Sequence, residues 1–166
     1  MNESMYVPYC ECTLLMARAD VPHEVVQKNV AMTKPVHILY YNARSLLPKF
    51  AVAEATCPDV ICIVESWLSD EISDNELAID NYQILRLNRN RHGGGVVMYI
   101  HSSLSHQVLS AGANNLELLI VSVSTLYGKF CISLFYRPPS SNVEIFDSLC
   151  TALLSLNPPF TIVLYS

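Results

Sequence analysis

Two short apolar stretches, each followed by a polar residue, decide the fold of this chain. Residues 36–42 read VHILYYN, and residues 60–67 read VICIVESW. Continuous apolar runs rich in β-branched residues are typical of strands that are buried on both faces of a sheet. Between them we expect a helix at about residues 46–55, capped by Ser45 and with Pro48 in its first turn. A strand, a helix and a strand in so short a span predict two parallel strands.

The polar residues that follow these two strands are the first candidates for a functional site. Asn42 ends the first stretch, and Glu65 follows the apolar part of the second. In open α/β sheets, ligands bind beyond the carboxyl ends of the parallel strands. Carboxylate and amide oxygens are ligands that hard metal ions accept. We therefore expect Asn42 and Glu65 to lie at the same sheet edge and to suit a metal site.

The composition indicates one globular domain. Of the 166 residues, 51% are hydrophobic and only 15% are charged, which suits a sheet that is buried on both faces. We expect the domain to span residues 36–166. Residues 1–35 have mixed polarity and no sustained hydrophobic period, so we expect them to form a poorly specified leader.

Charge and targeting signals limit the classes of partner. The net charge of −5 disfavours strong nonspecific binding of nucleic acid by the whole chain, although a local basic face can still contact DNA. The N-terminus lacks the regions of a signal peptide, and the most apolar tract, residues 118–136, contains a glycine, a lysine and several serines. Four of the six cysteines fall in or beside apolar segments and are interpreted as reduced. These features predict an intracellular protein, nuclear or cytoplasmic, with no membrane partner. The glycines at 93–95 form neither a GxGxxG motif nor a P-loop, and no small-molecule cofactor is expected.

The middle and the end of the chain alternate between strand patterns and turn residues. Strands are expected at residues 82–87, 96–100, 104–109, 116–124, 129–136 and 160–164, with a helix after Ser140 or Ser141. The first two strands should form an antiparallel hairpin, and the next three a meander. The acidic segment 69–76 is expected to be a solvated loop with a short helical turn; the alternative is a cation site near Glu65.

One loop carries a local basic patch. Arg89 and Arg91 lie between the two strands of the predicted hairpin, close to Arg86 and His92. Such a patch can meet the phosphate backbone of a nucleic acid. The alternative is a hairpin tip whose charges only keep it in solution. We take Arg89 and Arg91 as the candidate nucleic-acid contacts.

Four motifs resemble one family when they are taken in order. They are NARS at residues 42–45, PDVICIVESWL at 58–68, RNRHGGGV at 89–96 and FYRPPSS at 135–141. Together they resemble the endonuclease/exonuclease/phosphatase family, and more narrowly the apurinic-endonuclease-like domain of LINE-type (non-LTR) retrotransposons. The resemblance covers about residues 36–164 and leaves the leader outside.

The resemblance implies a fold, a chemistry and a set of site residues. The fold would be α/β, part of a four-layer sandwich with mixed, mainly antiparallel sheets. The activity would be hydrolysis of phosphodiester bonds in DNA, with Mg²⁺ as the cofactor. By resemblance, Asn42 would orient the metal-bound phosphate, Glu65 would ligate the metal, and Tyr136 would contact the phosphate as charge develops.

The sequence also departs from the pattern of the family. The family continues with a Gly-Asp-Phe-Asn motif, a further Asp and a Ser-Asp-His ending, whereas here residues 161–166 read TIVLYS and no histidine follows His106. We therefore expect a C-terminally truncated fragment that binds Mg²⁺ weakly, is inactive by itself and can self-associate through an exposed sheet edge. The alternatives are a complete phosphoesterase that uses the acidic loop, a noncatalytic remnant that binds nucleic acid or protein, and an open reading frame without selected function.

Overall fold

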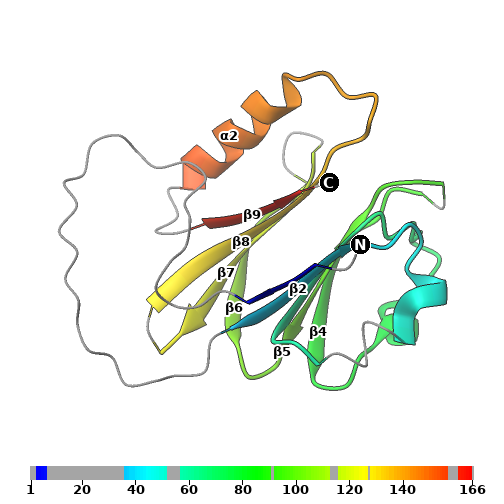
Figure 1. The fold of residues 1–166 in the computed structure, drawn as a ribbon, viewed down its shortest axis with the longest axis vertical. Coiled ribbons are helices and arrows are strands. Elements are labelled where there is room, and N and C mark those ends of the chain that lie inside the picture. The colour runs from blue at the N-terminus through cyan, green and yellow to red at the C-terminus, as the bar shows by residue number, and fades with distance from the viewer. Residues whose placement is uncertain are drawn as a thin grey trace.

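The chain folds into two β-sheets that pack face to face, with helical segments on their outer sides (Figure 1). The computed structural model of the chain describes residues 3–6, 36–51, 57–90, 92–112, 116–126, 128–156 and 161–165. The predicted α/β class with mixed, mainly antiparallel sheets is confirmed. The arrangement in four layers stays a prediction.

The first sheet contains the pair of strands that the sequence singles out. β2 and β3 run parallel, with Asn42 opposite Val64. The pairs β1–β2, β3–β5 and β4–β5 are antiparallel, so the predicted parallel unit and the predicted hairpin are both confirmed. In spatial order the strands are β1 (Glu3–Tyr6), β2 (His37–Asn42), β3 (Val60–Val64), β5 (Val96–His101) and β4 (Tyr82–Leu87).

The edge strand β1 comes from the segment that was expected to be a leader. It pairs with β2 in the register Glu3 opposite Tyr40 to Tyr6 opposite His37. Its four residues, ESMY, are too few to show the alternation from which a strand can be predicted. Residues 7–35 lie outside the described residues.

The connection between β2 and β3 starts differently from the prediction. A 3₁₀-helix, η1 (Leu47–Lys49), begins it, and its N-cap residue is Leu46. Ser45 was the predicted cap, but it does not cap this helix. Its φ is +84°, and its backbone N–H donates a hydrogen bond to the Glu65 carbonyl at 3.0 Å. It ties the loop after β2 to the loop after β3. Residues 52–55 of the predicted helix lie outside the described residues.

The second sheet is a meander with one parallel strand added. β6, β7 and β8 pair antiparallel in sequence order, as the sequence predicts. The helix α2 (Ile145–Leu156) then crosses over, and β9 pairs parallel with β8. In spatial order the strands are β6 (Ser105–Ala111), β7 (Glu117–Thr125), β8 (Gly128–Tyr136) and β9 (Thr161–Tyr165).

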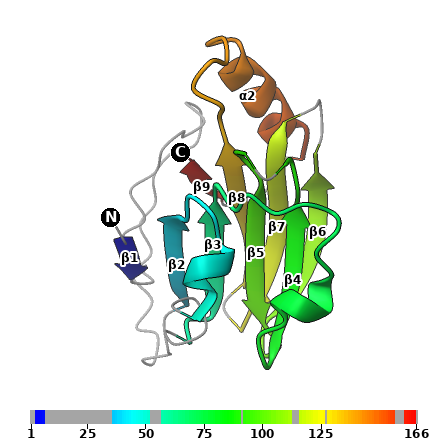
Figure 2. The ribbon, with the colours of Figure 1, turned by 90° about the vertical axis from the view of Figure 1, so that its right-hand side faces the viewer.

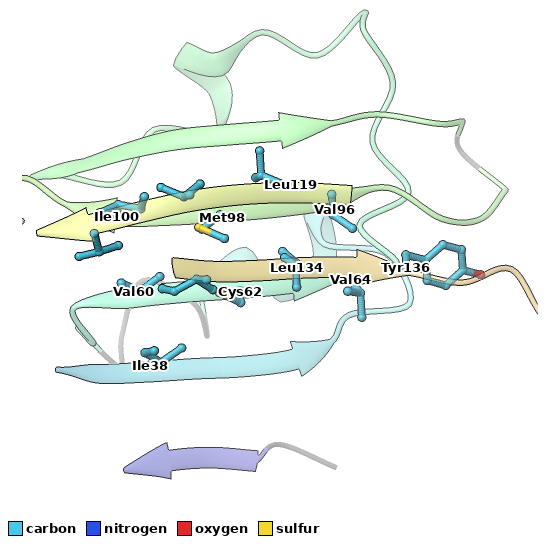
Figure 3. Packing of buried hydrophobic residues seen from close by; sticks show 13 residues of the cluster. Ile38, Val60, Cys62, Val64, Val96, Met98, Ile100, Leu119, Leu134 and Tyr136 are labelled. Atoms are coloured by element: carbon cyan, nitrogen blue, oxygen red, sulfur yellow. The ribbon is translucent and has the colours of Figure 1, made fainter. Parts of the chain in front are cut away.

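The core between the two sheets is built from alternate residues of the facing strands, because successive side chains of a strand point to opposite faces. Figure 3 shows Val64 and Val96 from the first sheet beside Leu134 and Tyr136 from the second. The cluster consists of Ile38, Val60, Cys62, Val64, Val96, Met98, Ile100, Leu119, Val121, Val123, Ile132, Leu134 and Tyr136. This shared core holds the two sheets together.

Each sheet also buries its outer face. Ile61, Ile63 and Tyr99 of the first sheet pack against Leu46 and Leu77 from the loops that cover it. Because β3 is buried on both faces, all five of its residues are inaccessible to solvent, as its sequence VICIV predicts. The second sheet is covered by α2, whose residues Leu149 and Ala152 pack among the buried side chains of its outer face (Figure 1).

Two expectations about partners, a membrane and a second copy of the chain, concern the surface of this fold. In the part of the chain that the structure describes, no helix is long and apolar enough to cross a membrane. Among the same residues, β9 pairs with β8 alone and is an edge of its sheet. Open edges are templates for pairing with another chain. Self-association through this edge stays a prediction.

Candidate functional site

The predicted site residues lie where three strands end. β2, β3 and β8 point toward the same end of the sandwich (Figure 2). Asn42 is the last residue of β2, Glu65 follows β3, and Tyr136 is the last residue of β8. The structure brings Glu65 and Tyr136 together in a side-chain hydrogen bond, although they come from different sheets. Asn42 lies beside them at the edge, since its strand partner Val64 immediately precedes Glu65.

Glu65 adopts a backbone conformation that is uncommon for its residue type. Its φ is +56°, and that of Trp67 is +55°. A non-glycine residue in this region costs about 1–3 kcal/mol and persists only where its surroundings hold it. Here the surroundings are the loop before β5, because Ser66 N–H donates to the Gly95 carbonyl at 3.2 Å and Trp67 N–H to the Gly94 carbonyl at 3.1 Å. Such strain is typical of functional sites.

The Glu65 carboxylate is held by donors on several sides. Trp67 Nε1 donates to Glu65 Oε2 at 2.5 Å, and the backbone N–H of Gly94 donates to the same oxygen at 3.5 Å. Burial raises the pKa of Glu65, but hydrogen bonds from Trp67, Tyr136 and Gly94 and the charge of Arg44 outweigh it, so the pKa is lowered overall. Glu65 is therefore ionised at neutral pH.

Tyr136 is a buried phenol whose hydroxyl reaches the site. Its side chain belongs to the core between the sheets, and it is only 5% exposed. Burial raises its pKa to about 12, and the hydrogen bond to Glu65 and the charges of Glu65 and Glu117 act in the same direction. The hydroxyl is consequently protonated at neutral pH, and it donates its hydrogen bond to the Glu65 carboxylate.

Glu117 is a site residue that the sequence analysis missed. Its Oε2 accepts a hydrogen bond from the backbone N–H of Gly95 at 2.5 Å, and its Oε1 forms an ion pair with Arg89 Nη1 at 3.2 Å. It lies opposite Tyr136 in the β7–β8 register. The sequence contained a signal for this position. In a hairpin that pairs Thr125 with Gly128, the residue eight positions before Thr125, which is Glu117, lies opposite the residue eight positions after Gly128, which is Tyr136.

The predicted basic patch is only partly present in the structure. Arg89 is exposed at this edge, with 42% of its side chain accessible. Arg91 lies outside the described residues. Arg86 belongs to the acidic loop instead: its Nε pairs with Asp74 Oδ1 at 2.7 Å, and its Nη2 donates to the Ile72 carbonyl at 2.6 Å. It is not available to a nucleic acid.

Several acidic side chains of the segment 69–76 form an ion pair or hydrogen bonds with neighbouring residues. Asp74 holds Arg86, and Asp70 Oδ1 accepts a hydrogen bond from Asn88 Nδ2 at 2.7 Å. Glu76 accepts from the backbone N–H of Ser73 at 2.9 Å at the start of η2 (Asp74–Leu77), which is the predicted short helical turn. Within the described residues, no three Asp, Glu, His or Cys side chains form a group that could hold a metal ion.

Two oxygen donors at the edge fit part of a site for a hard cation. Glu65 supplies an ionised carboxylate, and Asn42 is exposed at the end of β2 with its Oδ1 accepting from Arg44 N–H at 3.2 Å. Mg²⁺ prefers oxygen ligands, keeps several of its waters and binds through one or two carboxylates. The chemistry of Glu65 and Asn42 therefore suits Mg²⁺, with most positions left to water or substrate oxygens.

Comparison with known proteins identifies the fold. No family model and no curated protein matches the sequence. The chain is similar to the endonuclease domain of TRAS1, a telomere-specific non-LTR retrotransposon, with a TM-score of 0.57 and 13% identity over 77% of this chain and 57% of that one. It is also similar to the human Nocturnin catalytic domain, solved with a bound sulfate anion, with a TM-score of 0.49 and 16% identity over 70% of this chain and 54% of that one.

The similarity to TRAS1 agrees with the motifs in the sequence. The chain spans little more than half the length of either structure, so it corresponds to a part of each. The parallel pair β2–β3 and the meander β6–β7–β8, which the sequence predicts, are both present in the structure. The chain therefore shares the fold of part of the TRAS1 endonuclease domain, in agreement with the family that its sequence motifs resemble.

Proposed function

We propose that this chain carries one half of a metal-dependent DNA endonuclease site. The observation that carries the proposal is the ionised Glu65 carboxylate, which is held in a strained loop at a sheet edge with Asn42 beside it and the Tyr136 hydroxyl in contact with it. Strained backbone and carboxylates with shifted pKa values are both concentrated at functional sites. The resemblance of the motifs to LINE-type endonucleases gives these three residues their roles.

Each residue of this half-site would have a separate task. Glu65 and Asn42 would hold Mg²⁺ and the phosphate that it binds. The metal would supply positive charge that stabilises the phosphate oxygens during displacement. Tyr136, neutral at neutral pH, would donate a hydrogen bond to a phosphate oxygen as negative charge develops there. Arg89, exposed at the same edge, would contact the DNA backbone, and Arg91 is proposed to do the same.

The half-site is proposed to bind its cation weakly, because one carboxylate and one amide oxygen offset little of the cost of dehydrating a metal ion. Tb³⁺ is a suitable probe, since Trp67 is the only tryptophan of the chain and its indole contacts Glu65. Exciting Trp67 should produce Tb³⁺ emission with a dissociation constant of roughly 10⁻⁴–10⁻³ M, the range of weak oxygen sites. Excess Mg²⁺ should suppress it.

Two variants separate this site from the other carboxylates. Glu65→Gln should abolish the Tb³⁺ emission because it removes the charge and keeps the shape. Glu76→Gln is the matched control, since Glu76 also accepts backbone and side-chain hydrogen bonds but lies in the acidic loop. Emission that survives Glu65→Gln, or that saturates at low micromolar Tb³⁺ and disappears in Glu76→Gln, would contradict the proposed site.

Cleavage by the isolated chain is expected to be absent. Positioned acid–base groups contribute about 10²–10⁴-fold to such reactions. Among the described residues, the groups that act on the Glu65 carboxylate are Trp67, Tyr136, Gly94 and Arg44, none of which is a histidine or a second acid. In a plasmid-nicking assay with Mg²⁺, the chain should not exceed its Glu65→Ala variant. Nicking that is lost in Glu65→Ala or Tyr136→Phe would show that these residues suffice for catalysis.

A noncatalytic role in binding nucleic acid is the second candidate, and the exposure of Arg89 at the site edge favours it. Phosphate contacts make binding strongly dependent on salt. Salt-sensitive DNA binding by the chain, unchanged in Glu65→Gln and without any Tb³⁺ emission, would support this second function over the first.

A further inference from the structure

We infer that Glu117 is the positioning residue that joins the parts of the candidate site on the two sheets, by anchoring the Gly94–Gly95 turn of the first sheet to the strand pair that carries Tyr136. The expected effect on cation binding at Glu65 rests on the proposed function. The structural part of the inference, the anchoring of the turn, rests only on the contacts of Glu117.

Both oxygens of the Glu117 carboxylate are used. Oε2 accepts from the backbone N–H of Gly95 at 2.5 Å, and Oε1 pairs with Arg89 Nη1 at 3.2 Å. The side chain of Glu117 is only 18% exposed, compared with 42% for Arg89. An exposed ion pair by itself contributes little. This carboxylate differs, because it is mostly shielded and accepts a charge-assisted hydrogen bond from the backbone.

The Gly94–Gly95 turn lies between two carboxylates. The N–H of Gly94 donates to Glu65 Oε2, and the N–H of the next residue, Gly95, donates to Glu117 Oε2. The first contact is long at 3.5 Å and the second is short at 2.5 Å, so the turn is held mainly by Glu117. Once held, its carbonyls accept from the backbone N–H groups of Ser66 and Trp67 and fix the strained loop that presents Glu65.

Gly94 provides the space for this anchor. It has a φ of +73°, and a Cβ atom there would lie 2.6 Å from Glu117 Oε2 and 2.7 Å from Arg89 Cδ. Any side chain at this position would therefore displace the ion pair. The close approach of the turn to Glu117 therefore depends on a glycine at position 94.

The anchor also links the two sheets. Glu117 is the first residue of β7 and lies opposite Tyr136 of β8, whereas the turn precedes β5 of the first sheet. The Glu117 carboxylate thus adds a link between the strand pair that carries Tyr136 and the turn that holds the loop of Glu65. Loss of its charge should loosen the turn locally while the core between the sheets stays packed.

The test measures the turn first and the site second. Glu117→Gln keeps the shape of the side chain and removes its charge, and Glu117→Asp keeps the charge but shortens the reach by one methylene. Both should accelerate amide hydrogen exchange at Gly94 and Gly95 by about tenfold or more, the factor that corresponds to loss of a hydrogen bond to a charged group. Exchange in the middle of β3 should not change. Glu76→Gln is the control and should leave all of these amides unchanged.

The second readout is the affinity for Tb³⁺, followed through emission sensitised by Trp67. It should fall several-fold in both Glu117 variants, at a temperature where circular dichroism shows that they are folded. Unchanged exchange at Gly94 and Gly95 would overturn the inference. Faster exchange with no Tb³⁺ emission even from the unaltered chain would support the anchor and contradict the proposed function, so the two failures can be told apart.

Discussion

Replacing Gly95 by alanine is expected to destabilise the chain by about 2–4 kcal/mol, since both backbone strain and overpacking act there. Gly95 has a φ of +83°, a conformation that residues with a Cβ atom rarely adopt. An added Cβ would also lie 2.5 Å from Ser66 Oγ, and Ser66 is completely buried. Urea denaturation followed by circular dichroism measures the change.

The same loop offers a matched control. A Cβ atom at Gly93 would have no atom within 4 Å, and Gly93 is not among the glycines with positive φ. Gly93→Ala should therefore change the free energy of unfolding by less than about 0.5 kcal/mol, because the added Cβ atom causes neither a clash nor backbone strain. Equal effects of the two alanines would show that neither the positive φ nor the contact with Ser66 constrains position 95.

A double variant separates the two causes of the Gly95 effect. Ser66→Ala removes the hydroxyl that an alanine at position 95 would meet, and that hydroxyl has no hydrogen-bond partner among the described residues. In the Ser66→Ala background, Gly95→Ala should lose the part of its cost that comes from the clash and keep about 1–3 kcal/mol from the positive φ. A full recovery would assign the whole effect to the contact with Ser66.

The strands could be predicted because their sequences carry the pattern of their surroundings. β3 reads VICIV and is buried on both faces, and β4 and β5 flank a loop with three consecutive glycines. The positions of Asn42, Glu65 and Tyr136 followed from the order of strands and motifs, and the structure brings Glu65 and Tyr136 into contact. These features depend on local sequence or on the direction of neighbouring strands.

The remaining features depend on contacts between segments far apart in the sequence. Arg86 resembled part of a basic patch, but it turns to Asp74 because the acidic loop folds back over β4. Ser45 resembled a helix cap, but its backbone bonds to Glu65. Glu117 looked like an ordinary polar residue at the start of a strand, and only the packing of one sheet on the other brings it to Gly95. The spacing of the β7–β8 hairpin places Glu117 opposite Tyr136, but no period or spacing in the sequence predicts its contact with Gly95 of the other sheet.

The second large effect is expected at Phe135, which is completely buried under α2. Its ring lies 6.3 Å from that of Phe146 in an edge-to-face arrangement, and it packs with Leu149 and Ala152. Phe135→Ala should cost about 3–5 kcal/mol, because it removes a large buried ring and leaves a cavity. This is a large share of the roughly 5–15 kcal/mol by which a domain is usually stable.

The control for Phe135 is an apolar residue outside the core. Leu126 is 95% exposed, so Leu126→Ala should change the free energy of unfolding by less than about 0.5 kcal/mol. The loss at Phe135 also bears on the site, because Tyr136 is the next residue of β8 and points to the opposite face, toward Glu65. A strand that shifts into the cavity under α2 moves the hydroxyl of Tyr136, so Phe135→Ala should weaken Tb³⁺ binding as well as stability, both measured under folding conditions. A cost as small as that of Leu126→Ala would mean that α2 does not cover this face of the sheet.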